Sequence, residues 1–119
     1  MTETIDYPAR VNWNLLRVVE SIARRFVGSD VSITITTKTG SEFIVNSVDE
    51  IADDFHLMAS VVRKIKLRTS NYKNRKSFDF EADTVFYEDC IKYKIEGEKD
   101  EVFLVRNEIG AVFKSYKGS

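Results

Sequence analysis

Two alternating, charged segments in the middle of the chain constrain its fold more than any other feature. Residues 64–69 alternate between basic and apolar or threonine side chains, and residues 78–83 alternate between apolar and acidic ones. A period of two is typical of strands with one buried face. If the segments pair antiparallel with residue numbers that sum to 147, apolar residues meet on one face and opposite charges on the other, and a shift by one residue would break both sets. The predicted pairs are Ile65 with Ala82, Leu67 with Phe80, Thr69 with Phe78, Lys64 with Asp83, Lys66 with Glu81, and Arg68 with Asp79.

The segment that precedes this hairpin predicts a helix followed by another hairpin. Over residues 11–27, apolar side chains recur at the spacing of one helical face, and Gly28 follows where many helices end with a positive φ. Residues 31–36 then alternate between β-branched apolar and small polar side chains, as half-buried strands do. A tight turn over residues 38–40 and a returning strand over residues 41–46 complete this second hairpin.

A short capped helix is predicted between the two hairpins. Ser47 and Glu50 have the spacing of a capping box. In that arrangement the Ser47 hydroxyl accepts a hydrogen bond from the Glu50 N–H, and the Glu50 carboxylate accepts one from the Ser47 N–H. The apolar residues that follow predict a helix that ends near His56.

The last third of the chain predicts one more strand and a C-terminal helix. Residues 90–96 alternate, which places Lys92 and Lys94 on the same face of that strand. Residues 101–117 carry apolar side chains at helical spacing, with acids at the start and lysines at the end, so we expect a helix. The alternative is a two-strand hairpin that turns at residues 107–110, because a glycine lies inside the segment.

The predicted elements follow the order α-β-β-α-β-β-β-α, and residues 84–89 fit either an extended strand or a packed loop. Strands joined by short turns pair antiparallel, and a sheet with one apolar face needs a cover. The sequence therefore predicts an α+β fold. It consists of a single antiparallel sheet of about five strands, two amphipathic helices packed on one face, and the short capped helix between hairpins.

Length and charge bound the domain count and the function class. The 119 residues fit a single globular domain over residues 1–119, in which residues 1–9 could form a loose N-terminal arm. Lys and Arg number 18 against 19 Asp and Glu, and a net charge of −1 argues against a broad nucleic-acid surface. The single cysteine excludes an intrachain disulfide. The sequence shows neither a signal peptide nor a membrane-length apolar run, so we expect a cytoplasmic protein.

The residue types that usually carry catalysis or bind metals are scarce. His56 and Cys90 are the only histidine and the only cysteine, whereas a structural zinc site needs about four such ligands. The glycines are scattered singly and form no phosphate-binding loop. We therefore expect no enzyme, no metal site and no small-molecule cofactor, and an enzyme that uses scattered carboxylates is the weakest alternative.

A basic loop at the tip of the charged hairpin is the candidate binding site. Residues 61–76 carry seven basic residues and no acid, but the hairpin register pairs three of those cations with acids. The remaining tip could hold phosphates, stack a base, or contact an anionic membrane surface or an acidic protein. A solvated loop without a ligand is the simpler alternative. The candidate residues are Tyr72, Lys73, Arg75 and Lys76.

The function predicted from the sequence is binding rather than catalysis. A polar sheet face left open by the helices suits contact with another protein or self-association. We expect a non-catalytic protein-interaction or regulatory module, which could be the N-terminal soluble domain of a longer protein. The alternative is a nucleic-acid or phosphate-binding protein that uses the basic loop 71–76.

Overall fold

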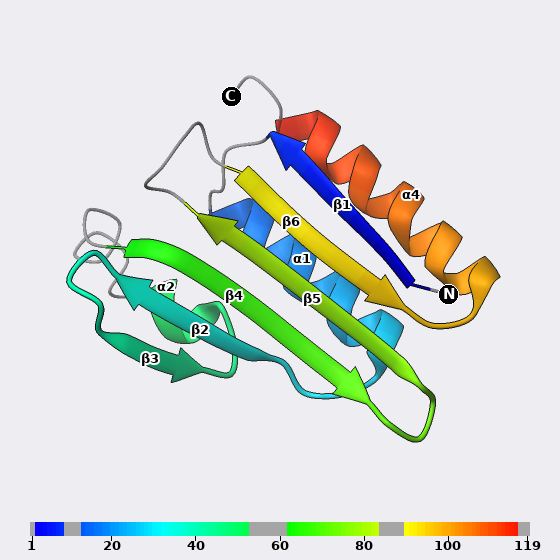
Figure 1. Cartoon of the computed structure of the whole chain (residues 1–119), viewed down its shortest axis with the longest axis horizontal. Helices are drawn as coiled ribbons and strands as arrows, with labels where there is room; N and C mark the ends of the chain where they lie inside the picture. Colours follow the sequence, from blue (N-terminus) through cyan, green and yellow to red (C-terminus); the bar gives the residue numbers. More distant parts are fainter. Residues whose placement is uncertain (1, 9–12, 53–61, 84–89, 117–119) are drawn as a thin grey trace.

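Six strands of the described chain form one antiparallel sheet, and the helices lie on one of its faces (Figure 1). The computed structural model describes residues 2–8, 13–52, 62–83 and 90–116. The strand order is β1-β6-β5-β4-β2-β3, which confirms the predicted α+β class. The elements are β1 (Thr2–Pro8), α1 (Trp13–Val27), β2 (Ser32–Thr37), β3 (Glu42–Val45), α2 (Asp49–Ala52), β4 (Val62–Asn71), β5 (Lys76–Asp83), β6 (Cys90–Glu96) and α4 (Lys99–Tyr116).

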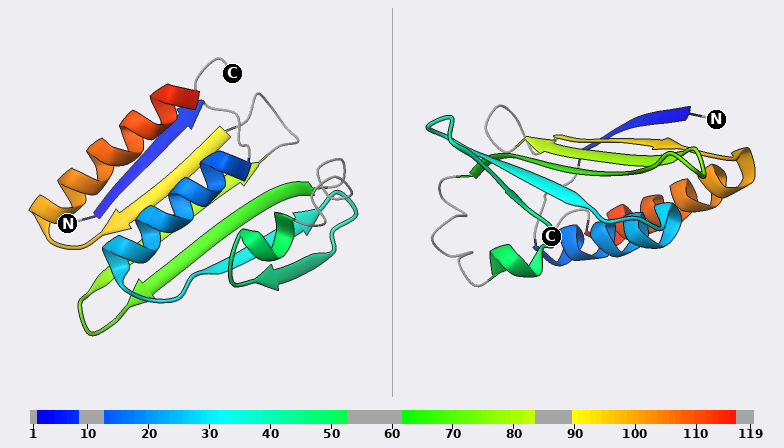
Figure 2. Two further views of the ribbon diagram at one scale, coloured as in Figure 1. Left: turned by 180° about the vertical axis from the view of Figure 1, so that it is seen from behind. Right: turned by 90° about the horizontal axis from the view of Figure 1, so that it is seen from below.

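The two long helices, α1 and α4, cover the same face of the sheet and pack against each other (Figure 2). Their apolar stripes meet the inward side chains of the central strands, and this burial is the main driving force of folding. Phe113 of α4 lies against Phe80 and Tyr93, with ring centroids 6.5 and 5.5 Å apart. The largest fully buried side chains are Phe78, Phe80, Phe113, Leu15, Leu16, Ile33, Ile35, Leu67, Ile91, Ile95 and Ile109.

The hairpin of β4 and β5 has the predicted register. All six predicted pairs occur, from Lys64 opposite Asp83 to Thr69 opposite Phe78. Leu67 and Phe80 are buried at the centre of the pair, under the helices. The hairpin therefore places one apolar face against α1 and α4 and leaves its charged face on the other side.

The N- and C-terminal segments complete the sheet and its cover. α4 is a helix, as predicted, and the alternative hairpin at residues 107–110 does not form. A sixth strand, β1, comes from the segment for which we considered a loose arm, and it pairs along β6 from Thr2 opposite Glu96 to Pro8 opposite Cys90. The uncertain segment 84–89 and the predicted end of the short helix at His56 lie outside the described residues.

The hydrogen bonds at the start of α2 differ from the predicted capping box. Ser47 Oγ accepts a hydrogen bond from the Asp49 N–H at 3.0 Å, and a Glu50 carboxylate oxygen accepts one from the Asn46 N–H at 2.9 Å. The predicted donors were the Glu50 and Ser47 amides, so the capping box is wrong: each donor lies one residue earlier. The two side chains still bond backbone amides near the N-terminus of α2, as caps do.

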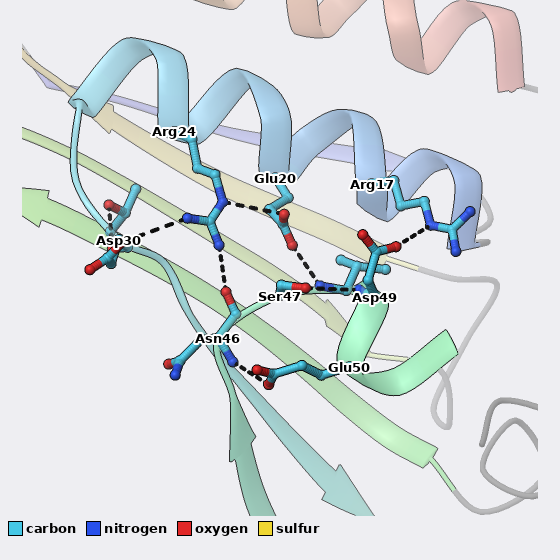
Figure 3. A network of polar contacts seen from close by, with 10 residues as sticks. Arg17, Glu20, Arg24, Asp30, Asn46, Ser47, Asp49 and Glu50 are labelled. Atoms are coloured by element: carbon cyan, nitrogen blue, oxygen red, sulfur yellow. Dashed lines mark hydrogen bonds and ion pairs between the residues drawn. The ribbon is translucent and has the colours of Figure 1, made fainter. Parts of the chain in front are cut away.

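A network of polar contacts from α1 meets the start of α2 (Figure 3). Glu20 Oε1 accepts a hydrogen bond from the Val48 N–H at 2.6 Å, and Glu20 Oε2 accepts one from Arg24 Nε at 3.3 Å. Arg24 Nη2 also donates to the Asn46 carbonyl at 2.5 Å. The Glu20 carboxylate thus satisfies the Val48 amide, one of the amides at the start of α2 that have no partner within the helix. The network joins α1 to the connection between β3 and α2.

Candidate functional site

The candidate site is the open face of the sheet, the side that α1 and α4 leave uncovered (Figure 2). Side chains alternate along a strand, so every second residue points to this face. The registers of β2, β4, β5 and β6 align these residues into rows across the strands. On the four inner strands, the open face consists of Ser32, Thr34 and Thr36 of β2, Lys64, Lys66, Arg68 and Ser70 of β4, Ser77, Asp79 and Glu81 of β5, and Lys92, Lys94 and Glu96 of β6.

Charges on the open face form stripes of alternating sign. The carboxylates of β5 lie between basic side chains of β4 on one side and of β6 on the other. The two central rows are Lys66–Glu81–Lys92, which the register continues to Asp6 of β1, and Arg68–Asp79–Lys94, which it continues to Thr4. The first row therefore balances two cations with two carboxylates, and the second carries a net positive charge.

Two ion pairs neutralise part of these charges. Arg68 Nε lies 3.1 Å from Asp79 Oδ1, which confirms the pair predicted from the register. Lys64 Nζ lies 2.6 Å from Glu81 Oε1. Lys66 lies opposite Glu81, as predicted, but the Glu81 carboxylate makes its ion pair diagonally with the neighbouring lysine of β4 and does not neutralise Lys66. Diagonal contacts are within reach of side chains as long as lysine and glutamate.

Three exposed lysines of the open face flank the acidic stripe of β5: Lys66 on β4, and Lys92 and Lys94 on β6. Among the side chains that the structure describes, no carboxylate lies within ion-pair distance of their ammonium groups. In the register, Lys92 also lies opposite Asp6 of β1. A ligand on this face would therefore meet exposed ammonium groups on both sides of the β5 carboxylates.

The centre of the open face is a shallow hollow of about 290 Å³, lined by both central rows. The rings of Phe80 and Tyr93 belong to the buried face, where these residues are 1% and 4% exposed. None of the open-face residues defined above is aromatic. Proteins that bind single-stranded nucleic acid on a sheet stack bases on aromatic side chains, so this face lacks the usual stacking platform.

The tip of the β4–β5 hairpin borders the open face and is held in one conformation. Asn71 Oδ1 accepts hydrogen bonds from the Lys73 and Asn74 amides, and Asn71 Nδ2 donates to the Val27 carbonyl at 3.3 Å. The hairpin tip is thereby fixed to the C-terminal end of α1. Arg75 follows with a φ of 53°, a left-handed conformation that is costly for a residue with a Cβ.

The four residues predicted for the basic loop do not share one environment. Tyr72 is 91% exposed, and the side chains of Lys73 and Arg75 are exposed beside it. Lys76 instead turns toward the helices, where its Nζ lies 2.7 Å from Glu101 Oε2 and 5.4 Å from the centre of the Phe26 ring. The structure thus groups three of the four predicted residues at the tip and assigns the fourth an ion pair with α4.

In the described ranges, the residue types that bind metal ions do not gather in one place. No three His, Cys, Asp or Glu side chains in them come close enough together to hold a metal ion. The side chains of His56 and Cys90, which the sequence singles out, lie outside the described part. The chemistry that the open face offers is therefore that of ammonium groups, carboxylates and hydroxyls on a broad surface.

Sequence reasoning located the hairpin tip but gave less weight to the lysines of β6. Their signal was present, because the alternation of residues 90–96 places Lys92 and Lys94 on one face. What the sequence did not show is that β6 lies beside β5, so that these lysines join the same rows as Glu81 and Asp79.

Two further findings bear on the class of protein. Among the helices that the structure describes, none has both the length and the apolar character needed to cross a membrane. Comparison of the chain with protein-family models, with curated proteins and with solved structures found no match.

Proposed function

We propose that this chain is a non-catalytic protein-binding module that recognises its partner through the open face. The observation that carries the proposal is the set of three exposed ammonium groups, on Lys66, Lys92 and Lys94, which flank a paired acidic stripe on the side of the sheet opposite α1 and α4. Charges arranged in this way select partners by complementarity and accelerate their encounter. A partner that presents carboxylates at the spacing of these lysines fits the surface.

The acidic stripe favours a folded protein over a nucleic acid as the ligand. A phosphate backbone laid across the face would pass over Asp79 and Glu81, and like charges at short range are repelled. A protein surface can match each stripe with groups of the opposite sign. The absence of aromatic side chains among the open-face residues points the same way, because sheet-face binders of RNA rely on stacking.

The size of the face predicts a transient complex. Six strands about 4.8 Å apart, with about six residues each, cover roughly 29 by 20 Å, or about 580 Å². Standard stable interfaces bury about 800 Å² on each partner. We therefore expect weak, salt-sensitive binding whose association rate depends strongly on charge.

Affinity capture with matched variants tests the proposal. The face variant is Lys66→Gln/Lys92→Gln, and the control is Lys38→Gln/Lys99→Gln, which removes two exposed cations elsewhere. Nuclease-treated lysate of the source organism supplies the partner, whose affinity for each protein is then titrated over a salt series. We expect the control to bind like the parent. The face variant should bind roughly 5- to 30-fold more weakly at low salt, from about 0.5–1 kcal/mol for each lost charge pair.

Two results would contradict this function. One is a captured protein that binds the face variant as tightly as the parent at every salt concentration. The other is capture of no protein by the parent chain from the nuclease-treated lysate. The second result would make the hairpin tip the stronger candidate for the binding site.

Nucleic-acid binding at the hairpin tip is the second candidate function. The observation that favours it is the exposed ring of Tyr72 beside the cations of Lys73 and Arg75, on a loop that Asn71 holds in place. The test is binding of a single-stranded oligonucleotide at low salt by the parent and by a Lys73→Gln/Arg75→Gln variant. Affinity that falls steeply with salt in the parent and is lost in the variant would support this function.

A further inference from the structure

Helix α4 has an exposed face that is separate from the open face of the sheet. Its buried stripe, which includes Val102 and Ile109, packs on the sheet and on α1. On the opposite side lie Phe103 and Leu104, which are 53% and 68% exposed. Two adjacent large apolar side chains at the surface of one helix are a typical sign of an interaction surface.

The exposed residues of α4 follow the spacing of a helix–helix seam. Steps of four, three, four and three residues average 3.5, the period at which two helices keep one face in contact. All five positions are exposed, so the seam has no partner within the described chain. The seam consists of Asp100, Leu104, Asn107, Ala111 and Lys114.

The seam is complementary to itself when two copies run antiparallel. A two-fold axis at Asn107 pairs Asp100 of one copy with Lys114 of the other, at both ends of the seam. A parallel pair would instead place each charged residue against its own counterpart, and like charges repel. Self-complementarity about a two-fold axis is what an interface between identical chains requires.

The shape of the helix surface agrees with this pairing. Open space surrounds the position that a Gly110 Cβ would occupy, and a shallow hollow of about 610 Å³ lies along the helix there. The same two-fold axis brings Phe103 of one copy to Ala111 of the other, beside this hollow, so a large side chain meets small ones. Gly110 and Ala111 thus leave room on this helix for a large side chain of a second copy.

We propose that a second copy of this chain docks on α4 of the first, antiparallel, with the two-fold axis at Asn107. The seam from Asp100 to Lys114 is about 21 Å long, at about 1.5 Å per residue. The surface lies on the helix layer, away from the open face, so this dimer does not depend on the proposed function.

Charge exchange at the ends of the seam tests the geometry. Sedimentation equilibrium over a concentration series should show a reversible dimer of the parent chain. Asp100→Lys or Lys114→Asp alone should weaken it about 10-fold, because each change places like charges together twice. The double variant Asp100→Lys/Lys114→Asp should recover most of the affinity. The helix dipole disfavours the exchanged charges, so helix stability cannot produce this recovery.

Disulfide trapping tests the position of the axis. In a Cys90→Ser background, Asn107→Cys lies on the axis and should cross-link two copies readily under mild oxidation. The matched control Ser115→Cys is exposed on the same helix, but its counterpart lies about 24 Å away in the antiparallel pair. A parent chain that stays monomeric at millimolar concentration, a double variant as weak as the single ones, or equal cross-linking of both cysteine variants would each overturn the proposal.

Discussion

The hydrogen bond between Glu20 and the Val48 amide gives a sharp prediction about how α1 and α2 are held together. Val48 is 1% exposed, so its N–H has no access to water if the carboxylate is removed. Loss of a helix-capping acceptor costs about 1 kcal/mol, and a donor left buried without a partner raises this to about 2 kcal/mol. The ion pair with Arg24 adds about 0.3–0.5 kcal/mol, which the higher helix propensity of alanine offsets.

We therefore expect Glu20→Ala to lower the free energy of unfolding by about 2 kcal/mol. In a domain of this size, that corresponds to a melting temperature lower by roughly 6–10 °C. Glu20→Gln keeps an oxygen acceptor for the Val48 N–H and loses only the charge, so it should cost about 0.5 kcal/mol. Urea unfolding followed by circular dichroism measures both changes.

Hydrogen exchange at the Val48 amide separates the hydrogen bond from the ion pair. Protection of this amide should fall in Glu20→Ala and persist in Glu20→Gln. Equal losses of stability in the two variants would show that the charge, and not the capping bond, is what matters. A Glu20→Ala variant within about 0.5 kcal/mol of the parent would refute the reasoning altogether.

Three other substitutions test the packing and backbone arguments, each by its urea midpoint. Phe113→Ala should destabilise the fold by about 3–5 kcal/mol, because the ring is buried against Phe80 and Tyr93, and a smaller loss would mean that α4 closes over the cavity. Arg75→Gly should stabilise it by about 0.5–1 kcal/mol by relieving the positive φ, unless the arginine side chain makes contacts that outweigh this relief. Gly97→Ala should destabilise it by about 1 kcal/mol, since the new Cβ would lie 3.0 Å from Cζ of Phe26, and an unchanged midpoint would show that this ring moves freely.

The register of the β4–β5 hairpin was predictable because both of its faces carry information. Apolar residues and opposite charges select the same pairing, so the local sequence has one good solution. β1 is different, because its partner β6 lies more than 80 residues away in the sequence. A short segment with two acids and a proline carries no local signal that identifies the distant strand with which it pairs. Strand pairing of this kind is decided by the assembled sheet rather than by the strand.

The side-chain partners of the charged residues were less predictable than the backbone. The sequence placed Lys76 in the basic loop, but Glu101 and Phe26, which hold it, come from two helices that meet only in the folded chain. The bond of Glu20 in α1 to the Val48 amide likewise joins residues 28 positions apart in the sequence and has no local signal. The alternation of the sequence predicts which residues share the open face. The charge balance of each row across the sheet depends on which strands become neighbours, which the alternation does not show.

The alternation of β4, β5 and β6 also separates two kinds of evolutionary change. Alternate residues such as Leu67 and Phe80 face the helices and form the hydrophobic core. The residues between them, such as Lys66 and Glu81, lie on the open face and take no part in that core. Substitutions on the open face therefore alter stability by only a few tenths of a kcal/mol, the range typical of surface positions. The same scaffold can therefore acquire a new partner through substitutions at every second residue, while the sequence at each step still folds.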